Sequence, residues 1–364
     1  MSYKVNSSCL KFSTISLFLL FFQIGFSQVK KVSKDIGTTQ FEGLDGLVQQ
    51  NQKLLGNNIV AMVWTDTLVY KRELGDFDSK TVAPIASCSK WLTAALVMMF
   101  VDEGKISLDD KVSKYIPDFE LYGKNYITIR HCLSHYTGIK SETGLRGILS
   151  RRKFNSLQEE AESYAKDEIE SNAGTEFRYS SVGLNIAGRI LEIVSKKKFD
   201  MLIKQKLFNP LGMRKTTFST LDGSAINPSG GAMSTADDYM HFLQMLLNNG
   251  KYHGSQILSE AAVKQMRQMQ TKPEEIKYVP AAGQGEGYAL GSWVLDPETN
   301  VSKDGTASVL ASPGLFGTWP MVDWCRGYAC IFFVKTLLSG EQKKDVYLQM
   351  KDAIDEKMPK KCSN

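Results

Sequence analysis

Strand-like segments occur only near the two ends of this chain, and the long stretch between them has helical periodicity. Two apolar runs at 58–65 and 67–74, on either side of a tight turn around Asp66, predict a hairpin. We predict three further strands, at 288–295, 312–322 and 327–336. Strands from both ends must share one sheet to bury their apolar faces. The pattern therefore predicts an α+β fold, in which an antiparallel β-sheet built from both termini is flanked by helices and carries an inserted, mostly helical subdomain.

The helical segments carry their own start and stop signals. An apolar run at 91–100 ends near Glu103-Gly104, where a glycine follows the last turn. Thr235 and Ser259 each stand at the N-cap position of an amphipathic run. The segment 272–287 is rich in proline and glycine and is expected to be a loop. We predict helices at 91–100, 128–134, 182–197, 236–248, 260–269 and about 340–356.

The first 27 residues have the layout of a secretory signal peptide. Lys4 and Lys11 give a positive start, and the apolar stretch at 15–26 is too short to span a bilayer. Gly25-Phe26-Ser27 is a small-x-small cleavage site. We therefore predict an exported protein, periplasmic or secreted, that keeps no stable membrane anchor once the signal is removed.

The mature chain is then expected to be one domain, 28–364. Its sheet would come from about 45–85 and 285–357, and its helical insert from about 86–284. With 44 basic and 39 acidic residues, the net charge of +5 is too balanced to favour nucleic acid as a partner.

The five cysteines of the mature chain do not form a spaced framework. Cys325 and Cys330 are the only pair close in sequence, and whether they form a disulfide stays open. Cys88 and Cys132 fall in apolar helical patterns and are predicted to be small buried residues. The lysine-rich segment 357–361 is expected to be a frayed tail.

Ser87 stands three residues before Lys90, at the start of the apolar helix. Residues at this spacing share a helix face, so the hydroxyl and the amine can meet. A lysine can activate a serine if burial depresses the lysine pKa, and a helix N-terminus offers free amides to a developing negative charge. The pattern alone also fits an N-capping serine followed by a surface lysine.

Six segments, in order, resemble the serine β-lactamase and penicillin-binding-protein superfamily, in its class C and esterase branch. They are 87–90, 103–110, 115–117, 127–138, 210–213 and 229–235. The resemblance implies the β-lactamase/transpeptidase fold, Ser87 as the nucleophile and Lys90 as its proton-transfer partner.

The family's second motif, Tyr-x-Asn, matches Tyr179-Ser180-Ser181, with Ser181 in place of the asparagine. The resemblance implies that Tyr179 relays protons with Lys90. Taken alone, Tyr179 also fits a core aromatic before a helix. The serine at 181, a substrate-binding position in the family, removes an amide that both donates and accepts hydrogen bonds.

The third motif, Lys-Thr-Gly or His-x-Gly, matches 312–319. Ser312 replaces the basic residue that contacts substrate, Gly314 allows close backbone approach, and Pro313, which lacks an N–H, fits an edge strand. The resemblance implies that the amides of Leu315 and Ser87 form an oxyanion hole. The same residues also fit a structural turn.

No cofactor or metal is expected. His131 and His135 have a ligand-like spacing, but both fall in a structural segment of the family. We predict an exported serine hydrolase that forms an acyl-enzyme on Ser87, an esterase or amidase acting on a small ester, amide or peptide. A D-alanyl-D-alanine peptidase or β-lactamase is the alternative. A catalytically weak binding protein on the same scaffold is a further alternative, kept open by Ser181 and Ser312.

Overall fold

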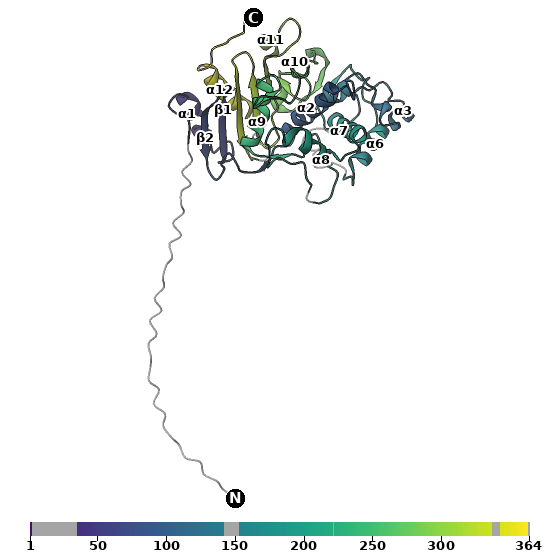
Figure 1. Cartoon of the computed structure of the whole chain (residues 1–364), viewed down its shortest axis with the longest axis horizontal. Helices are drawn as coiled ribbons and strands as arrows, with labels where there is room; N and C mark the ends of the chain where they lie inside the picture. Colours follow the sequence, from purple (N-terminus) through teal and green to yellow (C-terminus); the bar gives the residue numbers. More distant parts are fainter. Residues whose placement is uncertain (2–34, 142–152, 221, 337–342, 363–364) are drawn as a thin grey trace. The chain divides into compact units, whose positions relative to one another are not determined.

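The computed structural model describes residues 1, 35–141, 153–220, 222–336 and 343–362 (Figure 1). The described residues from 35 onward form one compact unit. Apart from Met1, the predicted signal peptide lies outside the described residues, so its prediction stands as made.

An antiparallel seven-stranded sheet organises this unit, in the order β2-β1-β13-β12-β11-β10-β9. The N-terminal hairpin therefore pairs with strands from the C-terminal third, which confirms the predicted α+β fold with a sheet built from both ends. The strands are β1 (Ile59–Trp64), β2 (Leu68–Leu74), β9 (Gly287–Tyr288), β10 (Trp293–Val294), β11 (Val309–Ala311), β12 (Trp319–Asp323) and β13 (Tyr328–Val334).

The two faces of the sheet are covered by different helices. In β1, Ile59, Ala61 and Val63 point to a core shared with α1 (Glu42–Gln50) and α12 (Lys344–Asp355), whereas Val60 and Met62 point to the main core. This alternation follows from the two-residue period of a strand. Figure 1 shows α1 and α12 on one side of the sheet and α9 on the other.

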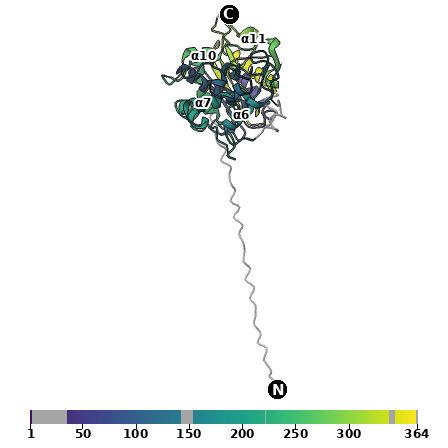
Figure 2. The ribbon, with the colours of Figure 1, turned by 90° about the vertical axis from the view of Figure 1, so that its right-hand side faces the viewer.

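The helical insert contains most of the remaining helices, and two of them begin at the predicted caps Thr235 and Ser259. Thr128, Thr235 and Ser259 each accept a hydrogen bond from a first-turn amide. Figure 2 looks onto α6 and α7, which pack side by side. The helices between the two parts of the sheet are α2 (Ser89–Asp102), α3 (Asp118–Leu121), α4 (Ile129–Leu133), α6 (Leu157–Lys166), α7 (Val182–Ser195), α8 (Phe199–Ile203), α9 (Ala236–Leu247) and α10 (Glu260–Met266). The short α11 (Pro297–Asn300) lies between β10 and β11.

Short two-stranded pairings bring distant segments together. β3 (Ala83–Pro84) pairs with β5 (Met233–Ser234), and β4 (Phe177–Arg178) runs parallel to β8 (Ile276–Tyr278). The first pairing places 229–235 against the start of α2. The β8 strand lies inside the segment predicted as a loop.

The predicted strand 312–322 is confirmed at 319–322 and wrong at 312–318. β11 ends at Ala311, a turn follows, and β12 begins at Trp319. The turn is closed by the Gly314 amide, which donates to the Thr318 carbonyl at 2.8 Å, and Gly317 has a φ of 92° that glycine adopts without strain. Pro313 therefore lies in a turn between two interior strands, not on a sheet edge.

The predicted strand 288–295 is also interrupted. β9 and β10 form a tight hairpin whose turn holds Gly291 at a φ of 79°. A Cβ added to Gly291 would lie 2.6 Å from the Ala94 Cβ and 2.9 Å from the Lys90 carbonyl oxygen. The turn thus packs directly on α2, and only glycine fits there.

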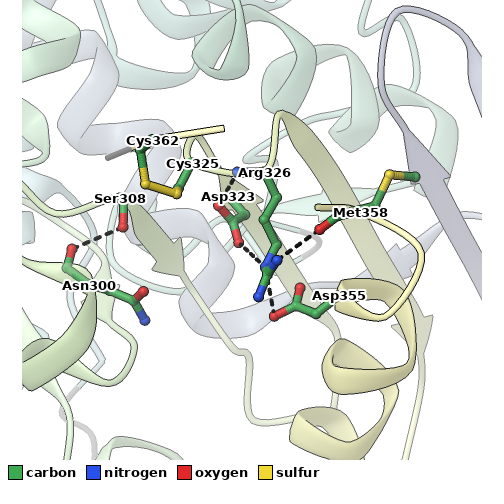
Figure 3. Close-up of a disulfide and its surroundings, with 8 residues drawn as sticks. All are labelled: Asn300, Ser308, Asp323, Cys325, Arg326, Asp355, Met358 and Cys362. Carbon is green, nitrogen blue, oxygen red and sulfur yellow. Dashed lines mark hydrogen bonds and ion pairs between the residues drawn. A yellow bond between two sulfur atoms is a disulfide. The ribbon is translucent and has the colours of Figure 1, made fainter. Parts of the chain in front are cut away.

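Cys325 pairs with Cys362, not with Cys330 (Figure 3). Cys330 is buried in β13, and Cys88 and Cys132 are buried thiols as well, which confirms the prediction for the last two. The lysine-rich segment 357–361 is not a frayed tail, because the Lys361 amide donates to the Cys325 carbonyl at 2.9 Å.

Arg326 fixes the same corner of the molecule. Its guanidinium bonds to the Met358 carbonyl at 2.8 Å and pairs with Asp355 at 3.0 Å and Asp323 at 3.6 Å, as Figure 3 shows. The disulfide and this arginine together tie the C-terminal residues to the β12–β13 turn.

Candidate active site

Ser87 and Lys90 meet at the start of α2. Ser87 lies in a single 3-10 turn, η1 (Ala86–Cys88), which leads into the helix, and its side chain is half-buried. The Nζ atom of Lys90 lies 3.1 Å from Ser87 Oγ, and the lysine is only 3% exposed. A buried amine in contact with an accessible hydroxyl is the arrangement that serine activation by lysine requires.

The backbone before Ser87 is strained, a feature that the sequence did not predict. Ala86 has a φ of 44°, in the left-handed region that a residue with a Cβ rarely adopts. Ser89 holds this conformation in place: its hydroxyl donates to the Ala86 carbonyl at 2.6 Å and accepts from the Ala232 amide at 3.0 Å. Ser89, fully buried, therefore fixes the peptide that carries the Ser87 side chain.

Lys90 is held by more than Ser87. Its Nζ donates to the carbonyl of Ser229 at 3.0 Å and lies 4.7 Å from the centre of the Tyr179 ring. The β3–β5 pairing brings the Ser229 segment to this point, and the parallel β4–β8 pair brings Tyr179. Three segments distant in sequence therefore converge on one amine.

Tyr179 belongs to an aromatic cluster. Its ring stacks on Trp293 at 5.1 Å and lies 4.5 Å from the ring of His135 and 6.0 Å from that of Tyr288. Its amide donates to the Tyr278 carbonyl at 3.1 Å. Tyr179 is itself partly exposed, so the cluster fixes the ring while its surface stays open.

His135 acts as a neutral support in this cluster. Its Nδ1 accepts from the Ser180 amide at 3.3 Å, which assigns the proton to Nε2, 3.0 Å from the Tyr288 hydroxyl. Burial, and then the positive charge of Lys90, hold the pKa of His135 well below its ordinary value of 6.5. His131 instead caps its own helix, with Nδ1 accepting from the Thr128 amide. Among the described residues, no cluster of side chains has the make-up of a metal site.

The turn between β11 and β12 packs against η1. Ser312, 3% exposed, donates from Oγ to the Ser87 carbonyl at 3.4 Å. A Cβ on Gly314 would lie 2.3 Å from the Ile85 carbonyl oxygen, so glycine is required for this approach. In the described part of the chain, no group accepts a hydrogen bond from the backbone N–H of Leu315 or Ser87. Both amides are therefore available to a substrate oxygen.

Ser181 is placed differently from the other predicted residues. It is exposed at the N-terminus of α7, and its hydroxyl makes no hydrogen bond to a residue that the structure describes.

Comparison with known proteins identifies the family of this chain. A family model described as Beta-lactamase matches residues 44–353. The chain belongs to the beta-lactamase family. Proteins with this fold are generally serine hydrolases, and the match spans both the sheet and the helical insert.

Curated relatives of this beta-lactamase family member are distant. Penicillin-binding protein 4 of Amycolatopsis lactamdurans is 28% identical over 240 residues, 57% of this chain and 62% of the relative. Protein flp of Staphylococcus aureus strain MW2 is 28% identical over 191 residues, 45% of this chain and 38% of the relative. The chain thus spans less than two thirds of the length of either protein.

A solved structure from Bacteroides dorei DSM 17855, whose beta-lactamase assignment is provisional, superposes with a TM-score of 0.75 at 25% identity. The match covers 86% of this chain and 98% of the other.

Within the described residues, no helix has the length and apolar character needed to cross a membrane.

Proposed function

We propose that this protein is an exported serine hydrolase that forms an acyl-enzyme on Ser87. The observation that carries the proposal is the 3.1 Å contact between the buried Lys90 Nζ and Ser87 Oγ. Burial disfavours the ammonium form of a lysine, and a neutral amine can accept the serine proton as the hydroxyl attacks a carbonyl.

Tyr179 shares this proton transfer. Lys90 lies over its ring, and the aromatic cluster fixes the ring in place. Once Ser87 Oγ bonds to the substrate carbon, the proton passes through the Lys90–Tyr179 pair to the leaving group. The C–O or C–N bond of the substrate then breaks, and water later releases the acyl group by the reverse sequence.

The negative oxygen that develops in each step is stabilised by the amides of Ser87 and Leu315. Neither has another acceptor among the described residues, and the close packing of Gly314 on Ile85 holds the two segments together. Fixed donors of this kind contribute more than solvent, because they need not reorient during the reaction.

The substrate is a small neutral ester or amide. The family's basic residue in the third motif helps to hold a substrate carboxylate, and Ser312 offers only a buried, uncharged hydroxyl. A charge-assisted hydrogen bond contributes about 1.5–3 kcal/mol, against about 1 kcal/mol for a neutral one. Ser181, exposed and short, weakens the grip on a substrate amide in the same way. Neither change impairs attack on an ester.

Export is supported by the Cys325–Cys362 disulfide as well as by the N-terminal sequence. Structural disulfides persist in oxidising compartments and are rare in the cytosol. A mature N-terminus near Gln28, found by mass spectrometry of the exported protein, would agree with this part of the proposal. An intact Met1 would contradict it.

A hydrolysis panel tests the substrate class. It compares a short-chain neutral aryl ester, the same ester carrying a terminal carboxylate, a chromogenic cephalosporin and a D-alanyl-D-alanine peptide. The neutral ester should have the highest kcat/KM. A faster cephalosporin or peptide would favour the β-lactamase or peptidase alternative, and turnover of none would favour the binding protein.

A further inference from the structure

The position of Lys90 depends on a backbone carbonyl that is itself held from two sides. Lys90 Nζ donates to the Ser229 carbonyl at 3.0 Å. The preceding carbonyl, of Pro228, accepts from Thr93 Oγ1 at 2.7 Å, so the 228–229 segment is tied to α2. The other side of the segment is tied to α7.

Asn185, on α7, makes that second connection. It is fully buried, and its Oδ1 accepts from the Ser229 amide at 3.0 Å. Its Nδ2 donates to Glu160 Oε1, also at 3.0 Å. The two bonds assign Oδ1 and Nδ2 of the Asn185 amide, since a carboxylate accepts a hydrogen bond and a backbone N–H donates one.

Glu160, on α6, completes the chain of contacts. It is fully buried, and its Oε1 also accepts from the Tyr164 hydroxyl at 2.8 Å. α6 and α7 pack side by side, as Figure 2 shows, so this carboxylate faces the inner side of α7. Burying a carboxylate costs free energy unless its oxygens accept hydrogen bonds. The bonds to Glu160 therefore offset the cost of placing a carboxylate here.

We propose that Asn185, oriented by Glu160, is a positioning residue for catalysis: it holds the Ser229 carbonyl that sets the place of Lys90 beside Ser87. The inference rests on the proposed function, because it assigns the Ser87–Lys90 pair to catalysis. It adds two buried residues, one from α6 and one from α7, that do not themselves face the substrate.

A swap of the two side chains tests this inference. In Asn185→Asp, residue 185 keeps its acceptor for the Ser229 amide, but two carboxylates face each other across the 3.0 Å contact. In Glu160→Gln/Asn185→Asp, the amide and the carboxylate exchange places and the repulsion between two carboxylates is removed, while the Tyr164 hydroxyl, which donates to Glu160 Oε1, must accept from the new amide instead. Asn185→Ala, which removes both bonds, is the second single variant. Tyr328→Phe is the control, because it removes a buried bond to Asp355 in the C-terminal corner.

The readouts are kcat and KM for a short-chain aryl ester and the rate of labelling by a fluorophosphonate, each below the unfolding midpoint of the variant. Asn185→Asp and Asn185→Ala should lower kcat and the labelling rate by about 10–100-fold with little change in KM, since small displacements of reacting groups have effects of this size. The swap should return kcat to within about threefold of the unmodified protein. Tyr328→Phe should lower the unfolding temperature and leave kcat unchanged.

The possible failures are distinguishable. If the unmodified protein neither hydrolyses the ester nor reacts with the fluorophosphonate, the proposed function is wrong, and this inference, which rests on it, is wrong as well. If the unmodified protein is active and both single variants keep its kcat, this inference alone is overturned. A swap as slow as Asn185→Asp would likewise overturn the role of Glu160. If Asn185→Asp does not fold, Asn185→Ala and the swap still decide the question.

Discussion

The amine of Lys90 lies 4.7 Å from the centre of the Tyr179 ring and 3.1 Å from the hydroxyl oxygen of Ser87. One buried amine therefore touches both the proposed nucleophile and its proposed proton relay. The amine lies over the face of the ring, so this contact does not depend on the tyrosine hydroxyl.

This geometry predicts that Lys90 and Tyr179 act as one unit. Tyr179→Phe keeps the ring on Trp293 and below Lys90, and removes only the hydroxyl. It and Lys90→Ala should each lower kcat on an aryl ester by about 10²–10⁴-fold. The double variant should be little slower than the slower single one. Losses that multiply would contradict a shared role.

Gly314→Ala should impair the oxyanion site. The new Cβ would lie 2.3 Å from the Ile85 carbonyl oxygen, so the turn carrying Leu315 must move. We expect kcat to fall by about 10²–10³-fold, the effect of losing one oxyanion donor. Gly46→Ala, in α1, is the matched control because its Cβ would meet no atom within 4 Å. Equal kcat values for the two variants would remove Leu315 from the site.

His135 should make stability depend on pH in one direction. Its folded-state pKa lies well below 6.5, so below that pH the unfolded chain takes up a proton that the folded protein does not. The free energy of unfolding should therefore fall as the pH drops below about 6.5, by up to about 1.4 kcal/mol per unit from this group. Denaturant unfolding between pH 5 and 8 should show a smaller slope in His135→Gln. An unchanged slope would mean that His135 has the same pKa in the folded and the unfolded protein.

The Cys325–Cys362 disulfide should stabilise the fold without contributing to the chemistry. It closes a loop with a sequence separation of 37 residues, for which chain entropy gives about 3–4 kcal/mol. Reduction should lower the free energy of unfolding by about this amount, and kcat should not change at temperatures where the protein stays folded. The double variant Cys325→Ser/Cys362→Ser should match the reduced protein and show no further response to reductant. If reductant leaves the free energy of unfolding of the unmodified protein unchanged, the disulfide does not stabilise the fold.

Local signals predicted much of the fold. The capping residues Thr235 and Ser259 mark helix starts that the structure confirms, because a cap is decided by residues within one turn. The sheet assembled from both ends was also predictable, since strands at the two ends have only each other to pair with. The sequence order of Ser87, Lys90 and Tyr179 placed them in motifs that the fold brings into contact.

The missed features depend on tertiary contacts. The run 312–322 has strand-like composition, but packing on η1 turns the chain at Gly314 and Gly317. The partner of Cys325 lies beyond α12, out of reach of any spacing argument.

The left-handed backbone of Ala86 carries no sequence signal. It persists because Ser89 bonds to both the Ala86 carbonyl and the Ala232 amide. Asn185 and Glu160 look like ordinary helix residues until α6 and α7 pack together.

Covalent labelling of Ser87 tests the central claim most directly. The purified protein is treated with a serine-directed fluorophosphonate, and the adduct is counted by intact mass and located by peptide mapping. The account predicts one adduct per chain, on Ser87. It predicts no adduct on a Ser87→Ala variant whose unfolding temperature matches that of the unmodified protein. An adduct of equal yield on Ser87→Ala, or none on the unmodified protein, would contradict the claim that Ser87 is the nucleophile of a serine hydrolase.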